Sequence, residues 1–289
     1  METRSVNAMT VDVEDYFQVS AFEDHIPRSS WERTPSRVEG NVGRILALFE
    51  EHDVKATFFT LGWVAKRHPS LIRQIASAGH EVASHGWSHV RVTELDEREF
   101  REDLVRTKAL LEDVSGVSVV GYRAPTYSIG EGNMWALRVI EETGHHYSSS
   151  IYPIRHDLYG MPDAPRFNFV PENCRSLVEV PVTTVQFGHV RIPCGGGGYF
   201  RLFPYRFSRW ALRRVNERDH HSAVFYFHPW EIDPSQPVQE GLPVRTRVRH
   251  YLNLSKMEGR LRRLAQDFKW DRMDKVFLDS GGDLRLDHV

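Results

Sequence analysis

Residues 37–89 read RVEGNVGRILALFEEHDVKATFFTLGWVAKRHPSLIRQIASAGHEVASHGWSH, and this stretch decides the fold class. The spacing of apolar residues predicts a helix over residues 37–51, with one face formed by Val38, Val42, Ile45 and Phe49. Residues 55–61 (KATFFTL) form a β-rich run, residues 69–78 begin with proline and stop before a glycine, and residues 81–84 (EVAS) form a short strand. A helix–strand–helix–strand order is typical of parallel strands connected by helices.

The same rhythm extends to both sides of this stretch. Residues 8–13 form an apolar strand that ends in acids, and a long helix follows Thr93, its expected N-cap, to about Gly116. Residues 117–122 are another strand, and residues 133–143 are another helix. We therefore expect an α/β fold, a barrel or an open sheet, in which the carboxyl ends of the strands carry the chemistry.

After about residue 157 this rhythm weakens. Proline-rich segments flank residues 178–187, and CGGGGYF at 194–200 is expected to be a flexible loop. A helix at about 206–217 precedes a strongly apolar strand at 223–227, and the tail contains a basic helix at 255–268.

The composition is that of an ordinary globular protein. The 289 residues include 37 Lys+Arg and 39 Asp+Glu, a net charge of −2, with 40% hydrophobic and 26% charged residues. This balance gives no electrostatic reason to expect nucleic acid as a partner. The length fits a barrel with an appendage. We expect a barrel domain over residues 1–240 and a C-terminal helical extension over residues 241–289 that packs on it.

The sequence also suggests a location. No stretch approaches the ~18 consecutive apolar residues of a transmembrane segment, and the N-terminal residues lack the apolar region of a secretory signal. The two cysteines, Cys174 and Cys194, are expected to be reduced thiols. We expect a cytoplasmic protein, and the oligomeric state is left open.

Three predicted strand ends carry reactive side chains, and the first is DVED at 12–15. Asp12 and Glu14 share one face of a strand because side chains alternate, and Asp15 joins them if the chain turns there. An isolated acidic segment is often an ordinary solvated loop. Its position directly after an apolar strand makes this one a candidate for catalysis or metal binding.

The second strand end is SHGWSH, residues 84–89. His85 and His89 are four residues apart, so both can bind one metal ion if the segment forms a helical turn. Gly86 permits a close approach of the chain. Surface histidines also occur at this spacing by chance. A carboxylate together with the two histidines would form a three-ligand site that is open to water and substrate.

The third strand end is FHPWE, residues 227–231. His228 is either a buried core histidine or a general acid, since imidazole titrates near neutral pH. A fourth segment is YRAPTY at 122–127, in which Arg123 can orient a carboxylate or form an ordinary salt bridge. Tyr127 and Trp230 could form walls on which a sugar ring stacks.

Taken in order, DVED, SHGWSH, YRAP and FHPWE resemble the NodB-homology polysaccharide deacetylases, carbohydrate esterase family 4. TVDVEDYFQVSAFE at 10–23 and GGGGYFR at 195–201 are similar to the bacterial subgroup associated with exosortase (PEP-CTERM) exopolysaccharide loci. The resemblance implies a distorted (β/α) barrel of seven or eight strands. It also implies a divalent metal, most often zinc, and a hydrolase that acts on linear amide bonds.

The resemblance further implies roles for the residues that match the family motifs. These roles are the base Asp12, the metal histidines His85 and His89, the base-orienting Arg123, the general acid His228, and the substrate-binding residues Pro125, Tyr127 and Trp230. Two features depart from the family pattern. The family has two adjacent aspartates, whereas Val13 follows Asp12 here, so the carboxylate ligand is Glu14 or Asp15, and alternation favours Glu14. No DxxxW-type motif is recognisable near residues 178–187, so the group that supports His228 is unidentified.

These features predict metal-dependent N-deacetylation of an N-acetylated sugar in an oligo- or polysaccharide, as a step of exopolysaccharide biosynthesis. Two alternatives stay open. One is an amidohydrolase of the same fold that opens a cyclic ureide or imide, as an allantoinase does. The other is a non-catalytic carbohydrate-binding protein of the same pathway, in which we would expect an incomplete set of acid and base residues.

Overall fold

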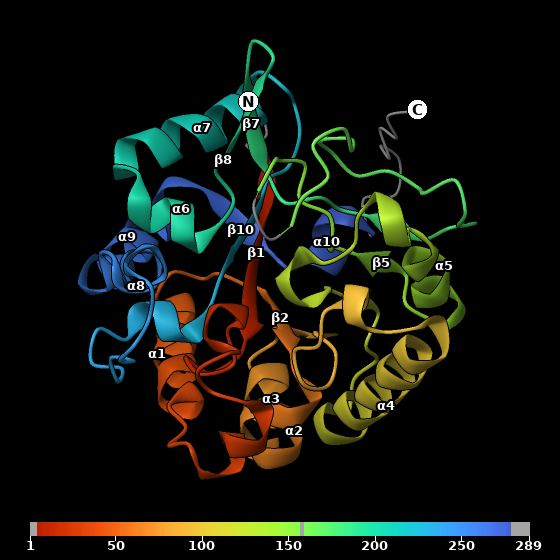
Figure 1. Ribbon diagram of the computed structural model, residues 1–289. Coiled ribbons are helices and arrows are strands. Elements are labelled where there is room, and N and C mark those ends of the chain that lie inside the picture. The colour runs from red at the N-terminus through yellow and green to blue at the C-terminus, as the bar shows by residue number, and fades with distance from the viewer. Residues whose placement is uncertain (1–4, 157–158, 279–289) are drawn as a thin grey trace.

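The computed structural model describes residues 5–156 and 159–278, and a parallel sheet lies at its centre (Figure 1). The order of its strands is β10-β1-β2-β3-β4-β5-β6, and β9 also pairs with β1. The strands are β1 (Val6–Val13), β2 (Thr57–Thr60), β3 (Glu81–Ser84), β4 (Gly121–Tyr122), β5 (Tyr147–Ser148), β6 (Val178–Glu179), β9 (Val224–Phe227) and β10 (Lys269–Asp271). A separate antiparallel hairpin contains β7 (Thr184–Phe187) and β8 (Val190–Pro193).

Helices surround this sheet. They are α1 (Val38–Glu51), α2 (Gly62–Arg67), α3 (Pro69–Ser77), α4 (Glu97–Ser115), α5 (Trp135–Glu142), α6 (Gly197–Leu202), α7 (Tyr205–Glu217), α8 (Val244–Tyr251), α9 (Leu254–Asp267) and α10 (Met273–Phe277). Figure 1 shows α1 to α5 below and to the right of the strands, and α6 to α9 on the left. Strands that alternate with helices and pair in parallel confirm the predicted α/β class.

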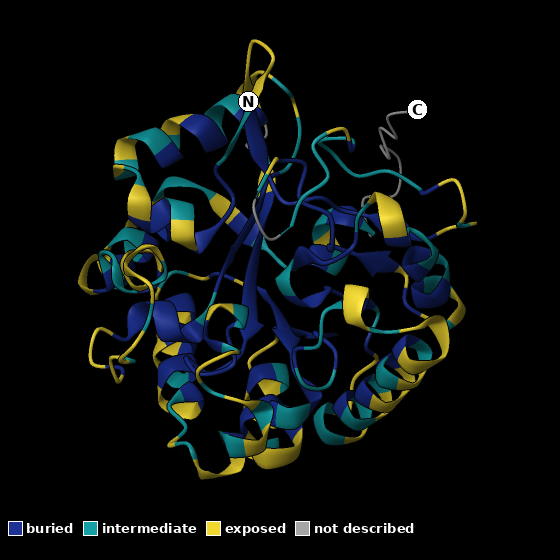
Figure 2. Ribbon diagram, viewed as in Figure 1, coloured by how far each residue is buried: buried dark blue, intermediate teal, exposed yellow. Residues whose placement is uncertain are grey.

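The central strand explains why the sheet is parallel and buried. Every residue of β1 after Val6 is buried, and β1 pairs in parallel with β2, β9 and β10. Met9, Val11 and Val13 belong to the main hydrophobic core, whereas Thr10 and Asp12, which alternate with them, accept hydrogen bonds from the buried Arg123 on the other face. Both faces of β1 are therefore covered. In Figure 2 the central strands are accordingly mostly dark blue, whereas the outer faces of helices, many loops and the end of the β7–β8 hairpin are exposed.

Some expected elements differ from the observed ones. Thr93 does not cap α4, because it lies in a separate 3-10 turn; Asp96 is the N-cap and forms a capping box with Glu99. The helix α2 was not predicted. The predicted strand at 117–122 is regular only over β4.

The glycine-rich segment is the largest difference. It was expected to be a flexible loop, but Gly196 forms a bridge with Tyr226 of β9, and α6 begins at Gly197. A Cβ atom on Gly195 would lie 2.4 Å from the carbonyl oxygen of Val224. Glycine is therefore required for this close approach of two backbones, and the segment is an ordered part of the barrel wall.

The tail beyond residue 240 contributes to the barrel itself. Strand β10 pairs with β1 at Val6–Ala8, and Met257, Leu261 and Leu264 of α9 belong to the main hydrophobic core. The boundary at residue 240 stays a prediction. Among the described helices, none combines the length and the apolar character that crossing a bilayer would require.

Candidate active site

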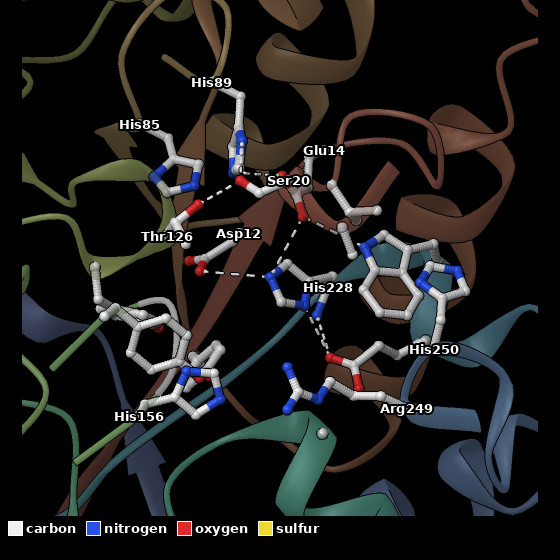
Figure 3. A pocket seen from close by; sticks show the side chains of 18 of the residues that line it. Asp12, Glu14, Ser20, His85, His89, Thr126, His156, His228, Arg249 and His250 are labelled. Atoms are coloured by element: carbon white, nitrogen blue, oxygen red, sulfur yellow. Dashed lines mark hydrogen bonds and ion pairs between the residues drawn. The ribbon is translucent and has the colours of Figure 1, made fainter. Parts of the chain in front are cut away.

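A cavity of about 190 Å³ lies at the carboxyl ends of β1, β3 and β9 (Figure 3). Parallel neighbours end at the same edge of a sheet, so the side chains that follow these strands meet there. The predicted site residues that line the cavity are Asp12, Glu14, His85, His89, Tyr127, His228 and Trp230. Arg123 lies directly behind Asp12, whereas Asp15 and Pro125 do not line the cavity.

Glu14, His85 and His89 form a cluster suited to a metal ion. One possible ligand atom from each of the three lies within 4.8 Å of the other two, and all three side chains are buried. His89 Nε2 is 3.0 Å from Glu14 Oε2. His85 Nδ1 lies 2.8 Å from the carbonyl oxygen of Arg123 and donates to it, which leaves Nε2 of His85 for a ligand bond.

The two histidines lie near each other without the helical turn that was considered for them. Residues 85–89 form a bend in which Gly86 and His89 adopt left-handed backbone angles, with φ of 71° and 55°. A Cβ atom on Gly86 would lie 2.9 Å from the carboxylate of Asp103, which accepts a hydrogen bond from the backbone N–H of Trp87. Glycine is needed at this position, and the bend brings both imidazoles to one side.

The ionisation states of the cluster suit a cation. Burial alone would raise the pKa of Glu14, but His89 and His228 lower it to about 2. Burial lowers the pKa of His85 to about 4. An ionised carboxylate and a neutral imidazole are the forms that bind a divalent metal. Apart from its ion-pair contact with His89, Glu14 Oε2 accepts no hydrogen bond from the described residues, so it can take an ion as its partner.

Asp15 serves a different purpose from Glu14. Its Oδ2 accepts hydrogen bonds from the hydroxyl of Ser36 at 2.7 Å and from the backbone N–H groups of Arg37 and Val38 at 2.7 and 3.1 Å. These groups lie at the N-terminus of α1, where unpaired N–H groups attract a carboxylate. Asp15 therefore caps a helix, and the cluster of possible metal ligands contains Glu14 instead.

Asp12 is held by a buried arginine. Arg123 Nη1 donates to Asp12 Oδ1 at 2.6 Å, and the same guanidinium donates to Thr10 and to both oxygens of Ser149. Arg123 is fully buried, and its guanidinium lies 4.0 Å from the centre of the Phe59 ring. This network keeps the second oxygen, Oδ2, turned toward the cavity, where His228 Nε2 lies 3.9 Å away.

The structure also identifies what supports His228. Its Nδ1 lies 2.9 Å from Glu231 Oε1, three residues further along, and Glu231 Oε2 accepts from Arg201 Nε at 2.6 Å. The other ring nitrogen, Nε2, faces Glu14 Oε1 at 3.4 Å. Burial alone would lower the pKa of His228, but the carboxylates of Glu14, Glu231 and Asp12 raise it to about 9. These three carboxylates therefore favour the charged form of the imidazole, which has a proton on both nitrogens.

The three predicted substrate-binding residues differ in their positions. Tyr127 lines the cavity and contacts the rings of Tyr152 and Tyr226. Trp230 also lines it, but His228 and His250 stack on its two faces at 5.1 and 4.2 Å, so neither face is open to a sugar. Pro125 is buried in van der Waals range of the Gly86 position, where it shapes the loop behind the cavity.

Ser20, Thr126, Glu231 and Arg201 are among the residues of this site that sequence reasoning missed. The Ser20 hydroxyl lies 2.5 Å from that of Thr126 and 3.5 Å from His89 Nδ1. Thr126 has a φ of 56°, a strained value typical of functional sites. The carboxylate three residues after His228 was a visible signal, because that spacing brings a side chain back to the start of a turn. No sequence signal pairs Arg201 with it.

Two family models match parts of this chain. Residues 24–148 match the family model "Polysaccharide deacetylase", and residues 149–278 match "Domain of unknown function (DUF3473)". A peptidoglycan-N-acetylglucosamine deacetylase of Bacillus cereus is 34% identical over 94 residues, which are 32% of this chain and 34% of that protein. A chitooligosaccharide deacetylase of Rhizobium leguminosarum bv. trifolii is 47% identical over 64 residues, 21% of this chain and 30% of that protein. The chain thus matches about a third of the length of these relatives.

Solved structures share the fold. A Mycobacterium smegmatis protein assigned to the polysaccharide deacetylases has a TM-score of 0.61 and 23% identity, covering 96% of this chain and 90% of its own. The Puue allantoinase has a TM-score of 0.59 and 16% identity, covering 94% and 89%. These likenesses show the predicted distorted (β/α) barrel. Residues 24–148 of this chain are thus similar to the polysaccharide deacetylases, and the solved structures share the fold of the whole described chain.

Proposed function

We propose that this chain is a metal-dependent hydrolase that removes the acetyl group from an N-acetylated sugar in an oligo- or polysaccharide. One observation carries the proposal: a metal-binding cluster, a carboxylate base and a protonated imidazole converge on a single cavity. The deacetylase relatives support the same reaction class. N-deacetylation needs these three elements, since the amide must be activated, a water deprotonated and the amine protonated as it leaves.

Glu14, His85 and His89 would hold the metal. A set of two imidazoles and one carboxylate leaves coordination positions open and suits zinc, which we propose as the ion. When bound, such an ion polarises the acetyl carbonyl oxygen and lowers the pKa of a water.

Asp12 is the proposed general base. Its Oδ2 faces the cavity while Arg123 binds Oδ1, so the carboxylate is oriented and keeps one oxygen available for a proton. As the water oxygen bonds to the carbonyl carbon, Asp12 takes the proton of that water. Such a base contributes ~10²–10⁴-fold to the rate.

His228 is the proposed general acid. Its Nε2 points into the cavity across from Asp12, and its raised pKa keeps it protonated at neutral pH. Nε2 gives its proton to the amide nitrogen as the carbon–nitrogen bond breaks, which releases a neutral amine rather than an amide anion. The products are acetate and a free amino sugar.

The finer parts of this proposal concern the biological setting. We place the chain in the exosortase-associated subgroup and in exopolysaccharide biosynthesis, and the cytoplasmic location stays a prediction. The support is the similarity of residues 10–23 and 195–201 to strings of that subgroup.

Bound metal and acetate release test the proposal together. Wild-type protein reloaded with zinc is expected to carry about one ion per chain by mass spectrometry and to release acetate from N-acetylglucosamine oligosaccharides. His89→Ala is expected to lose both properties. His189→Ala, which changes an exposed histidine on the β7–β8 hairpin, is the matched control and keeps both. Wild-type protein that binds metal but opens allantoin and releases no acetate would move the assignment to the cyclic-amide alternative. Protein that binds no metal would contradict the mechanism.

A further inference from the structure

We propose that Glu231 and Arg201 are positioning residues that hold His228 in its catalytic orientation. The proposal would add two further residues of the segment 149–278, which matches the model "Domain of unknown function (DUF3473)", to the groups that serve the chemistry. What His228 does rests on the proposed function, whereas how His228 is held rests on the contacts described below.

Glu231 binds His228 at two points. Its Oε1 lies 2.9 Å from the imidazole Nδ1 and 3.1 Å from the backbone nitrogen of the same residue, which also donates to it. A carboxylate bound to both the ring and the backbone prevents rotation of the side chain. The Nδ1 proton then points at Glu231, on the side of the ring away from the cavity, and Nε2 stays directed at the cavity.

Arg201 fixes that carboxylate in turn. Its Nε donates to Glu231 Oε2 at 2.6 Å, and its Nη1 donates to the carbonyl oxygens of His250 at 2.9 Å and Leu252 at 2.7 Å. Arg201 is 2% exposed and Glu231 is fully buried. An ion pair buried this deeply needs partners for its remaining hydrogen-bonding groups. The carbonyls at the C-terminal end of α8, which have no partner within the helix, accept these hydrogen bonds from Arg201.

The surrounding packing fits only this arrangement. A Cβ atom on Gly197, the first residue of α6, would lie 2.2 Å from Glu231 Oε1, so glycine is what allows α6 to carry Arg201 to this place. From the other side, the Trp230 ring stacks between His228 and His250, and His250 belongs to α8. Segments from α6, α8 and the turn after β9 thus meet around one imidazole.

A neighbouring arginine provides a control that distinguishes a positioning residue from one that only stabilises the structure. Arg260 of α9 donates through Nη1 to the carbonyl oxygens of Arg201 and Phe203 at 3.0 and 3.1 Å, and likewise to that of Phe200. Arg260 therefore stabilises α6 through its backbone carbonyls, as Arg201 stabilises the end of α8. In the described part of the chain, however, no hydrogen bond or ion pair of Arg260 reaches Glu231. Arg260→Lys is the matched control for Arg201→Lys.

The first measurement needs no activity. In proton NMR, an imidazole N–H bonded to a carboxylate gives a downfield signal protected from exchange, and loss of that signal in His228→Ala assigns it. We expect the signal in wild-type protein and in Arg260→Lys. We expect it to disappear or move upfield in Glu231→Gln and Arg201→Lys. An unchanged signal in Glu231→Gln, or no such signal in wild-type protein, would overturn the proposal.

The second measurement is the kinetics of acetate release. For Glu231→Gln and Arg201→Lys we expect kcat to fall about tenfold or more, within the ~10²–10⁴-fold that a general acid contributes, with KM nearly unchanged. Guanidinium ion should restore part of kcat to Arg201→Ala but not to Glu231→Gln. Equal losses in Arg260→Lys and Arg201→Lys would reduce both to structural roles. If the NMR result holds but wild-type protein releases no acetate, the positioning inference stands and the proposed function fails.

Discussion

The two parts of the chain bring their reactive side chains to the cavity in different ways. In the N-terminal part, the described residues up to 148, each reactive group lies at or just after a strand: Asp12 and Glu14 at the end of β1, His85 after β3, and Arg123 after β4. In the C-terminal part, the described residues from 149 to 278, only His228 follows a strand. Its supports, Glu231 and Arg201, come from a turn and from α6.

The difference shows how each part achieves precision. The N-terminal part relies on the register of adjacent parallel strands, which places strand ends side by side without further help. The C-terminal part relies on a buried ion pair that joins α6 to the turn after β9, and on hydrogen bonds from the same arginine to the end of α8. We therefore expect substitutions in the two parts to fail in different ways, and four predictions test this.

The largest effect is expected at the base and the acid. Asp12→Asn and His228→Asn should each lower kcat by ~10²–10⁴-fold, because each removes one proton transfer. The double variant should lose much less than the product of the two effects, since residues that act as a unit are not additive. Acetate-release kinetics on metal-loaded protein measures this, with metal content as the check. Substantial activity in Asp12→Asn would remove that residue from the role of base.

The next effect separates Glu14 from its neighbour Asp15. Glu14→Gln should weaken zinc binding by at least ~100-fold, because loss of a direct ligand exceeds the 10–100-fold cost of losing a ligand's hydrogen-bond partner. Asp15→Asn should keep the zinc affinity and instead lower the free energy of unfolding by about 1 kcal/mol through its cap on α1. Competition with a chelator and urea unfolding measure the two quantities. The reverse pattern would make Asp15 the ligand.

The same contrast explains how much could be predicted from the sequence. The parallel sheet and the strand-end residues Asp12, His85 and His228 are readable because hydrophobic runs mark strands, and reactive groups follow them directly. The favoured choice of Glu14 over Asp15 depended on period-two alternation, and in the structure Glu14 lies with the histidines.

The remaining features depend on contacts between distant segments. Arg201 meets Glu231 across 30 positions, and the glycine run before it is ordered only because Val224 and Glu231 lie against it. Strand β10 is three residues long and pairs with β1 from the other end of the chain. Local patterns contain no information on such pairings, so a loop was expected at the glycines and a stacking wall at Trp230.

A smaller effect is expected for neighbouring glycines of the C-terminal part. Gly197→Ala would place a Cβ atom 2.2 Å from Glu231 Oε1, whereas a Cβ atom on Gly198 would meet nothing within 4 Å. We expect Gly197→Ala to lower the free energy of unfolding by about 1–3 kcal/mol, the usual cost of overpacking, and to reduce kcat by displacing Glu231. Gly198→Ala should change the free energy of unfolding by no more than about 0.5 kcal/mol and should leave kcat unchanged. Equal effects at both positions would mean that Glu231 can move aside freely.

The smallest effect lies at the opposite end of the barrel, where Glu81 joins the two parts. Its carboxylate accepts hydrogen bonds from the Thr57 hydroxyl at 2.5 Å, the Tyr147 hydroxyl at 2.9 Å and the backbone N–H of Asp274 at 3.3 Å. Burial, with the nearby Asp274, raises the pKa of Glu81 well above its ordinary value. The folded protein therefore keeps a proton at pH values where the unfolded chain has already lost it.

Because the pKa of Glu81 is higher in the folded state than in the unfolded state, the free energy of unfolding should decrease as pH rises. The decrease should begin above about pH 4.5, where an unfolded glutamate ionises, and end near the raised pKa of the folded state. In Glu81→Gln the side-chain amide can still form hydrogen bonds with the same neighbours but does not titrate. The decrease in the free energy of unfolding with pH should therefore become smaller by about 1–2 kcal/mol. Urea unfolding at pH 6 and pH 8 measures it, with the exposed Glu102→Gln of α4 as control. If wild-type protein and Glu81→Gln show the same decrease, Glu81 is ionised in the fold. The junction of the two parts would then depend on a buried charge at this end of the barrel, as it does in the active site.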